Sequence, residues 1–329
     1  MKKGLSVGVS RMYWCLAGCS LWLYLGQSWL FAQPPAGQVI AAAVAQEIPS
    51  LGSVSPIELI KDGFKFLEGP AKTPDGNLYF TDIPAETIFV LTSAGQIEEY
   101  LKPSGFANGL MYAGDGQLLV CQMAGQLSRI DLASKKVTVL ADKYGGARLN
   151  APNDLVIDKQ GGIYFTDPRY RAPDPWPQTV EAFYYRAADG TVTRLGSGLK
   201  APNGIALAPD EQTLYVIPSM QSEMMAYPID SPGKIGEGRV FCQLQQVGEE
   251  TAGGGDGLAV DVKGNLYITS AAGIQVYSAA GELLGIIKVP QQPANCAFGG
   301  ADNKVLYITA RTGLYHCNMP IPGHLHRDK

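Results

Sequence analysis

The stretch EGPAKTPDGNLYFTD, residues 68–82, joins an acidic residue to a turn and a strand. Its second half predicts a turn at residues 75–77 and a strand at residues 78–81. Related stretches begin at Asn108, Asn153, Asn203, Asp256 and, less regularly, Asn295. The six copies start 40, 45, 50, 53 and 39 residues apart. The stretch is therefore one unit of a sixfold repeat.

Each repeat contains a short apolar strand, a polar turn that usually holds glycine, and a second strand rich in Tyr, Leu, Val and Ile. The segments between copies, such as FYYRAADGTVTRLGSG at residues 183–198, supply a further pair of strands with an Asp-Gly turn. A strand repeat of this length is typical of a β-propeller, in which one repeat forms one four-stranded blade. We therefore predict an all-β fold, a six-bladed β-propeller. We expect a strand from residues 57–66 to complete the last blade and close the ring.

The N-terminus has the composition of an export signal. The first 32 residues contain Lys2, Lys3 and Arg11, no acidic residue, and an apolar run from Met12 to Leu30. This pattern predicts a signal peptide over residues 1–32, and an uncleaved membrane anchor is the alternative. Lipidation at Cys19 is disfavoured because the apolar run continues past it. Residues 33–56, rich in Ala and Pro, predict a flexible linker, and residues 57–329 form the propeller domain.

Composition limits the possible partners. Of 329 residues, 46% are hydrophobic, which is enough for a large core. Removing the three basic residues of the signal leaves 23 basic and 30 acidic residues, a net charge of about −7, so nucleic acid is not an expected partner. Cys121, Cys242, Cys296 and Cys317 show no CxxC spacing and are predicted to be core thiols, although export would permit a disulfide.

The first residues of the six repeats should converge at one end of the central channel. These ring residues all carry a side-chain oxygen: Glu68, Asn108, Asn153, Asn203, Asp256 and Asn295. Local capping is one explanation, because Asn and Asp often bond to nearby backbone at turns. Capping gives no reason for Glu68.

A metal ion would account for the glutamate. Two carboxylates in a narrow channel repel each other and are poorly solvated unless a cation lies between them. Oxygen ligands without sulfur or imidazole favour a hard ion, and several ligands plus water suit Ca²⁺ better than Mg²⁺. We therefore expect Ca²⁺, with other divalent cations possible.

Four stretches give the chain a family resemblance: EGPAKTPDGNLYFTD, RLNAPNDLVID, APNGIALAPD and GGGDGLAVDVKGNLYIT. Over about residues 57–317 the chain resembles the gluconolactonase and regucalcin family, six-bladed propellers that include calcium-dependent lactonases. The resemblance implies a metal held by Glu68, Asn203 and Asp256. Asn153 is implied as a further ligand or a substrate contact.

The resemblance also places Asn108 at the wall of the substrate pocket. It departs from the family at Ala151, where regucalcin carries an arginine. Arg148 lies nearby in the sequence and is either a substrate contact or a solvated loop residue.

The expected chemistry depends on the metal and the carboxylates. The three histidines, His316, His324 and His326, fall within the last 14 residues, which disfavours a Ser-His-Asp triad or a histidine zinc site. A divalent ion can polarise a carbonyl while an aspartate takes a proton from water. By family resemblance Asp256 is the candidate base. Asp154 is its rival, but strand alternation would point it away from Asn153, which favours a structural role.

We therefore expect an exported, periplasmic or extracellular, calcium-dependent lactonase acting on a small-molecule lactone or ester. We expect a monomer, with membrane contact only if the N-terminal segment is uncleaved. Two alternatives remain: a non-catalytic, metal-stabilised binding module and a strictosidine-synthase-like propeller enzyme. The latter would not need the pair Asn203 and Asp256. The proline-rich stretch at residues 166–179 is expected either to shape the pocket or to pack over a blade edge.

The signal peptide can be checked directly. Mass spectrometry of the native protein should show a chain that starts near Gln33 and is found outside the cytoplasm, because the preceding segment is removed on export. An intact N-terminus on a soluble cytoplasmic protein would refute the prediction.

Overall fold

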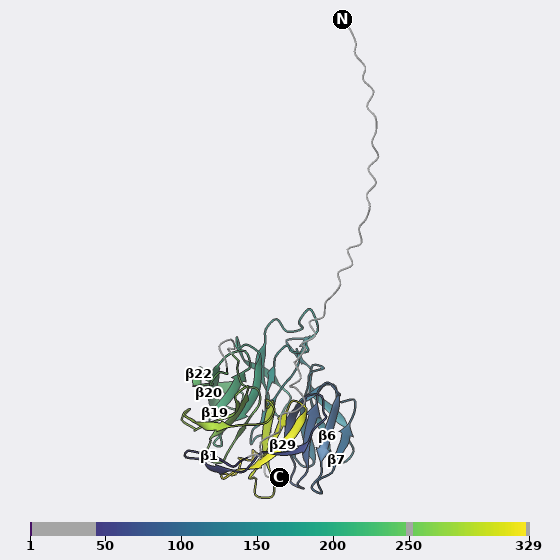
Figure 1. Ribbon diagram of the computed structural model, residues 1–329. Helices are drawn as coiled ribbons and strands as arrows, with labels where there is room; N and C mark the ends of the chain where they lie inside the picture. Colours follow the sequence, from purple (N-terminus) through teal and green to yellow (C-terminus); the bar gives the residue numbers. More distant parts are fainter. Residues whose placement is uncertain (2–43, 248–252, 327–329) are drawn as a thin grey trace. The chain divides into compact units, whose positions relative to one another are not determined.

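The computed structural model describes residue 1, residues 44–247 and residues 253–326 (Figure 1). Nearly all of the predicted signal peptide and the first part of the predicted linker lie outside the described residues. No helix in the described part of the chain is long and apolar enough to cross a membrane. The named elements are strands, and they form the six blades of a β-propeller, which confirms the predicted fold class.

Blades 1 to 3 follow one another along the chain as antiparallel sheets, each numbered from its inner strand outward. Blade 1 contains β4 (Leu67–Lys72), β5 (Leu78–Asp82), β6 (Thr87–Leu91) and β7 (Ile97–Leu101). Blade 2 contains β8 (Ala107–Gly114), β9 (Gln117–Gln122), β10 (Gln126–Asp131) and β11 (Val137–Ala141). A small hairpin, β12 (Lys143–Tyr144) and β13 (Ala147–Arg148), precedes blade 3. Blade 3 contains β14 (Leu155–Ile157), β15 (Ile163–Asp167), β16 (Ala182–Arg186) and β17 (Val192–Ser197).

Blades 4 to 6 complete the ring. Blade 4 contains β18 (Pro202–Leu207), β19 (Thr213–Pro218), β20 (Glu223–Ser231), β22 (Arg239–Gln243) and the short β21 (Lys234–Ile235). Blade 5 contains β23 (Leu258–Val260), β24 (Leu266–Ser270), β25 (Gly273–Tyr277) and β26 (Leu283–Ile287). Blade 6 contains β27 (Asn295–Gly299), β28 (Val305–Ala310), β29 (Gly313–Asn318) and β3 (Glu58–Lys61).

The ring closes by pairing strands from the two ends of the domain. Strand β3 pairs antiparallel with β29, with Lys61 opposite Leu314 and Glu58 opposite His316. This confirms that the N-terminal segment supplies the outer strand of the last blade. The pairing covers an edge that would otherwise expose unpaired backbone groups.

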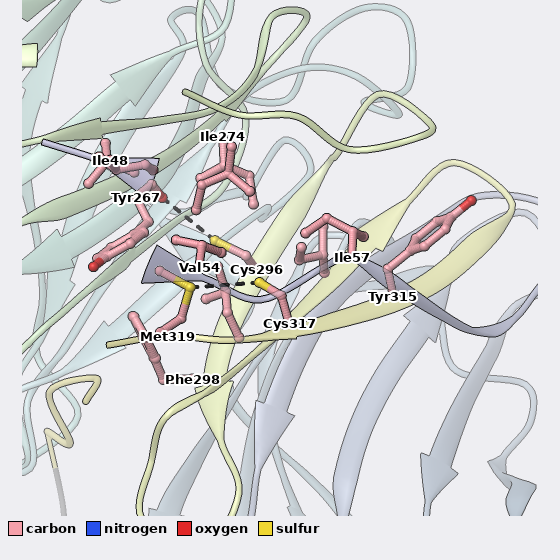
Figure 2. Close-up of a cluster of buried hydrophobic side chains, with 14 of the residues drawn as sticks. Ile48, Val54, Ile57, Tyr267, Ile274, Cys296, Phe298, Tyr315, Cys317 and Met319 are labelled. Atoms are coloured by element: carbon pink, nitrogen blue, oxygen red, sulfur yellow. Dashed lines mark hydrogen bonds between the residues drawn. The ribbon is translucent and has the colours of Figure 1, made fainter. Parts of the chain in front are cut away.

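One expectation about the linker is wrong. Residues 46–54, assigned to a flexible tether, instead form a hairpin of β1 (Gln46–Ile48) and β2 (Gly52–Val54). Figure 2 shows Ile48 and Val54 within the cluster of buried side chains from blades 5 and 6. The side-chain oxygen of Gln46 also accepts a hydrogen bond from Lys288 N–H at 2.9 Å. A few apolar residues in an otherwise small-residue segment suffice to anchor it, because each is buried.

Neighbouring blades are joined by threonines at the ends of their second strands. The hydroxyl of Thr81 donates to the carbonyl of Asn108 at 3.1 Å, and that of Thr166 donates to the carbonyl of Asn203 at 2.7 Å. Thr269 donates in the same way to the carbonyl of Ala294 at 2.7 Å. These buried hydrogen bonds fix the position of the next blade's inner strand along the channel axis.

The cysteines are core thiols, as predicted. All four in the described residues are buried and free. Figure 2 shows Cys296 and Cys317 within the cluster between blades 5 and 6, where the Cys296 thiol donates to the carbonyl of Tyr267. They contribute as small apolar side chains.

The packed hairpin makes a prediction about stability. Ile48→Ala should lower the free energy of unfolding by about 2 to 4 kcal/mol, because Ile48 is only 4% exposed. Leu59→Ala is the control: Leu59 lies on β3 but is 51% exposed, and its loss should cost within about 0.5 kcal/mol. Urea unfolding of both variants measures the difference. Equal stability of the two variants would show that the hairpin is not docked.

Candidate active site

The ring residues lie next to one another because the inner strands of adjacent blades are bonded at this level. The N–H of Gly109 donates to the carbonyl of Asn153 at 2.7 Å, and the N–H of Gly204 donates to the carbonyl of Asp256 at 2.9 Å. Five of the six ring residues are buried, and Asp256 is partly exposed. The prediction that these side chains share one end of the channel is consistent with these contacts.

A glycine after the ring residue permits this close approach. A Cβ atom at Gly69 would overlap the carbonyl oxygen of Asn108, and one at Gly257 would overlap the side chain of Asn295. Gly69 also has a φ of 46°, in the left-handed region that favours glycine. The recurring dipeptides Glu-Gly, Asn-Gly and Asp-Gly are thus the local sequence signal for the ring.

Blade 3 breaks this pattern and brings in a third carboxylate. Asp154 occupies the place that glycine takes after most other ring residues. Strand alternation was expected to point its side chain away from Asn153, but that argument does not hold here. Asn153 and Asp154 precede β14, so strand alternation does not apply to them, and the Asp154 carboxylate faces Asn295. The missing glycine in APND was the signal that could have identified it.

One amide bridges two of the three carboxylates, and a second amide holds the third. Asn295 Nδ2 donates to Glu68 Oε2 at 2.9 Å and to Asp154 Oδ2 at 3.4 Å. Asn203 Nδ2 donates to Asp256 Oδ1 at 2.6 Å and to Ser219 Oγ at 3.0 Å. Of the predicted site residues, Asn203 thus bonds to Asp256, and the charge of Asp256 interacts with Glu68; Asp154 and Ser219 are additional neighbours.

Burying the three carboxylates near one another is electrostatically unfavourable for the folded protein. Burial raises the pKa of Glu68 well above its usual value, and the charges of Asp256 and Asp154 raise it further. Burial also raises the pKa of Asp154 to about 6 and that of Asp256 to about 7. Arg311 opposes the shift at Asp256. A cation among these groups would relieve the cost.

The donor set fits a hard metal ion. The Oδ1 atoms of Asn108 and Asn203 are buried and have no hydrogen-bond partner among the residues that the structure describes. Within the described residues, no three His, Cys, Asp or Glu side chains could hold a metal by themselves, so a metal at the ring would also need amide oxygens. Glu68, Asn203 and Asp256 supply such a mixed set, with Asn108 beside them. Carboxylate and amide oxygens are the ligands of Ca²⁺.

The remaining predicted residues differ in their surroundings. Asn153 is buried, and its carbonyl accepts the bond from Gly109, while its side-chain role stays a prediction. The Arg148 guanidinium donates to the carbonyls of Leu149 at 2.8 Å and Asn150 at 2.7 Å. These bonds engage Arg148 with its own loop, and a contact with substrate stays a prediction.

A cavity of about 340 Å³ occupies the channel between the inner strands. Asp154 and Asn295 border it at the ring, while His324 and His326 border it near the C-terminus. The side chains between them are largely apolar, including Leu110, Met111, Ile205 and Phe298. The polar ring therefore lies at one end of an otherwise mostly apolar channel.

The loop between β15 and β16 adds a tyrosine to the site. Tyr170 lies on this loop, where the charge of Asp256 affects its hydroxyl. Burial, followed by the charge of Asp256, raises the pKa of Tyr170 to about 12. The sequence marked this loop as a possible pocket wall without singling out Tyr170, and no pattern pointed to Ser219 or Arg311.

Fold and ring together define a six-bladed propeller with carboxylate and amide groups gathered at one end of its channel. The sequence profile of the SMP-30/Gluconolactonase/LRE-like region matches residues 66–312. The chain belongs to this family.

Similar proteins cover most of the chain. A gluconolactonase of Zymomonas mobilis is 32% identical over 282 residues, which are 78% of this chain and 79% of that protein. The pentonolactonase XacC of Haloferax volcanii is 26% identical over 255 residues, covering 75% and 81% of the two chains. The solved structure of a gluconolactonase from Xanthomonas campestris superposes with a TM-score of 0.75 at 29% identity, covering 87% of this chain and 99% of that one.

The raised pKa values predict how stability changes with pH in metal-free protein. Below about pH 4, Asp256 is protonated in both the folded and the unfolded chain. As the pH rises, the unfolded chain ionises first, so the cost of Asp256 to stability grows until the pH reaches its folded pKa of about 7 and stays at its full value above that. Asp256→Asn should therefore gain about 1 to 4 kcal/mol over the parent between about pH 4 and about pH 8.

Urea unfolding in EDTA across this pH range measures the gain. Asp189→Asn is the control, because hydrogen bonds from Thr191 lower the pKa of that exposed carboxylate and its replacement should bring no such gain. A gain for Asp256→Asn that does not grow with pH would contradict the assigned cost.

Proposed function

We propose that this protein is a divalent-metal-dependent lactonase that opens a sugar lactone, or a related ester, with Ca²⁺ as the metal. One observation carries the proposal: two carboxylates whose charges repel each other, Glu68 and Asp256, lie near the amide oxygen of Asn203, which has no partner among the described residues. The relatives named gluconolactonase and pentonolactonase support a lactone as the substrate class.

Glu68, Asn203 and Asp256 would hold the metal, with Asn153 as a further ligand. When bound, the ion supplies a Lewis acid that polarises the lactone carbonyl and stabilises the oxyanion. Asn108 and Asn153 would then face the substrate from blades 2 and 3. Arg148 is the remaining candidate for a substrate contact. It would use guanidinium N–H groups that do not bond to its own loop.

Asp256 is the proposed base. Its Oδ1 is fixed by the short bond from Asn203, and Oδ2 accepts no hydrogen bond from the described residues, so it can receive a proton from water. Asp154 is more fully engaged, because its Oδ1 accepts from Leu155 N–H and its Oδ2 from Asn295. This difference favours Asp256 over Asp154.

We also propose that the enzyme acts outside the cytoplasm. The acid-free, apolar N-terminus supports export.

Three variants should separate metal binding from proton transfer. Glu68→Gln and Asp256→Asn each remove a channel carboxylate, so both should lower Ca²⁺ affinity. Saturating Ca²⁺ should partly restore Glu68→Gln, which keeps the base. Asp256→Asn should stay about 10² to 10⁴ slower, because an amide cannot accept the proton. Asp154→Asn should keep most of the turnover.

The measurement is hydrolysis of glucono-δ-lactone across a calcium titration, with Asp189→Asn as the matched control in an exposed turn. Equal rescue of Glu68→Gln and Asp256→Asn, together with loss of turnover in Asp154→Asn, would transfer the role of base to Asp154. A parent protein that binds Ca²⁺ but hydrolyses no lactone would support a non-catalytic binding module instead.

A further inference from the structure

The loop between β15 and β16, here called the mouth loop (residues 168–181), begins beside the ring residues. At the end of β15, the carbonyl of Thr166 accepts a hydrogen bond from Asn153 N–H at 2.9 Å. The carboxylate of the next residue, Asp167, accepts from Ala151 N–H at 2.7 Å. The mouth loop therefore leaves blade 3 at the ring end of the channel.

Hydrogen bonds fix the mouth loop at both ends. Near its start, Arg169 N–H donates to Glu181 Oε1 at 3.2 Å, and the Arg169 guanidinium pairs with the same oxygen at 3.5 Å. Glu181 Oε2 accepts from the N–H of Ala201, two residues before Asn203, at 3.1 Å. Near the loop's end, the side-chain amide of Gln178 donates to three carbonyls of the β12–β13 hairpin. The loop is thus tied to the backbone next to the ring.

The middle of the mouth loop contacts blade 2 through Arg171. Its guanidinium lies over the ring of Phe106, 3.8 Å from the centroid. The carbonyl of Phe106 accepts from Met123 N–H at 3.0 Å, and Met123 Sδ accepts from the side-chain amide of Asn108 at 3.7 Å. Consecutive contacts therefore join Arg171 to a ring residue, with Phe106 and Met123 between them.

Arg171 differs from the other arginines near the ring end in what its guanidinium binds. Arg148 bonds to two carbonyls of its own loop, and Arg169 forms the ion pair described above. Arg311 donates to Gln292 Oε1 at 2.6 Å. Within the described residues, the guanidinium of Arg171 forms no hydrogen bond and no ion pair, and the residue is exposed. Its donors are accessible to a ligand.

Stacking on Phe106 prepares the Arg171 guanidinium for an anion. A guanidinium over an aromatic face keeps its N–H groups free at its edge, where they match two oxygens of a carboxylate or phosphate. The stacked and anchored side chain also loses less conformational freedom when it binds. Because Phe106 and Met123 separate Arg171 from Asn108, an anion at Arg171 does not lie among the ring carboxylates that would repel it.

We propose that Arg171 forms a subsite for an anionic group of the substrate. The inference rests on the proposed lactonase function and narrows its substrate class to sugar lactones that carry a carboxylate or a phosphate on the carbon chain, away from the lactone carbonyl. The guanidinium contacts this group in the substrate and in the transition state alike. Its loss therefore raises KM and leaves kcat nearly unchanged.

The test compares three lactones in the parent and in Arg171→Gln. Glucono-δ-lactone is neutral, its 6-phosphate carries a phosphate, and glucarolactone carries a carboxylate. For Arg171→Gln, KM for at least one anionic lactone should rise about 3- to 30-fold, the size of a charge-assisted contact at an exposed site. KM for glucono-δ-lactone and every kcat should stay within about twofold of the parent. The lactone with the larger change identifies the preferred anion.

Two controls accompany this comparison. Arg194→Gln makes the same chemical change on β17, where the guanidinium lies over the ring of Tyr144 at 5.1 Å, and it should match the parent with all three lactones. Added salt should raise KM for the preferred anionic lactone in the parent more than in Arg171→Gln, because salt screens the contact of an exposed charge.

The outcomes separate this inference from the proposed function. A parent that hydrolyses glucono-δ-lactone, with unchanged KM for both anionic lactones in Arg171→Gln, overturns the subsite and leaves the lactonase standing. An equal rise in KM for neutral and anionic lactones also overturns it, because Arg171 would then only support the loop. A parent that hydrolyses no lactone overturns the proposed function. Calorimetry with 6-phosphogluconate and glucarate then decides the subsite: no binding, or equal binding by parent and Arg171→Gln, ends it.

Discussion

The site depends on the close approach of neighbouring inner strands at the ring. Backbone bonds such as those from Gly109 to Asn153 and from Gly204 to Asp256 leave little room for a Cβ atom. In each blade that has this glycine, the preceding residue is therefore held at the same position along the channel axis. The repeats can then present six oxygen-bearing side chains to one space, one from each blade, and blade 3 adds Asp154 as a second group. The threonine bonds between blades maintain this level around the ring.

Blade 3 shows what happens when the requirement is relaxed. Asp154 replaces glycine and adds a carboxylate near Glu68. Burial raises the pKa of both carboxylates, and the charge of Asp154 raises the pKa of Glu68 further. The fold accommodates this charge by bridging it to Glu68 through Asn295. Such a local conflict costs stability, and conflicts of this kind are expected at functional sites. The same cost is what makes the ring favourable for a cation.

The two ends of the channel have different roles. At the ring end, Asn203 joins Ser219 from blade 4 to the proposed base Asp256. At the other end, the C-terminal segment places His324 and His326 against the cavity. Within the described chain the histidines thus lie away from the ring, as their positions in the sequence suggested. Recognition of a substrate would depend on the loops, which the repeats do not constrain.

The sequence by itself determined the sixfold repeat, the strand and turn types, the ring residues and the segment that closes the last blade. These features follow from the spacing of residues along the chain and from glycine at positions where strands approach closely. Both can be read directly from the amino-acid sequence. Only the tertiary structure decided the direction of Asp154, the docking of residues 46–54, the engagement of Arg148 and the contact of Asn203 with Ser219. Each of these depends on contacts between separate strands or loops, often in different blades, and local patterns do not encode such contacts.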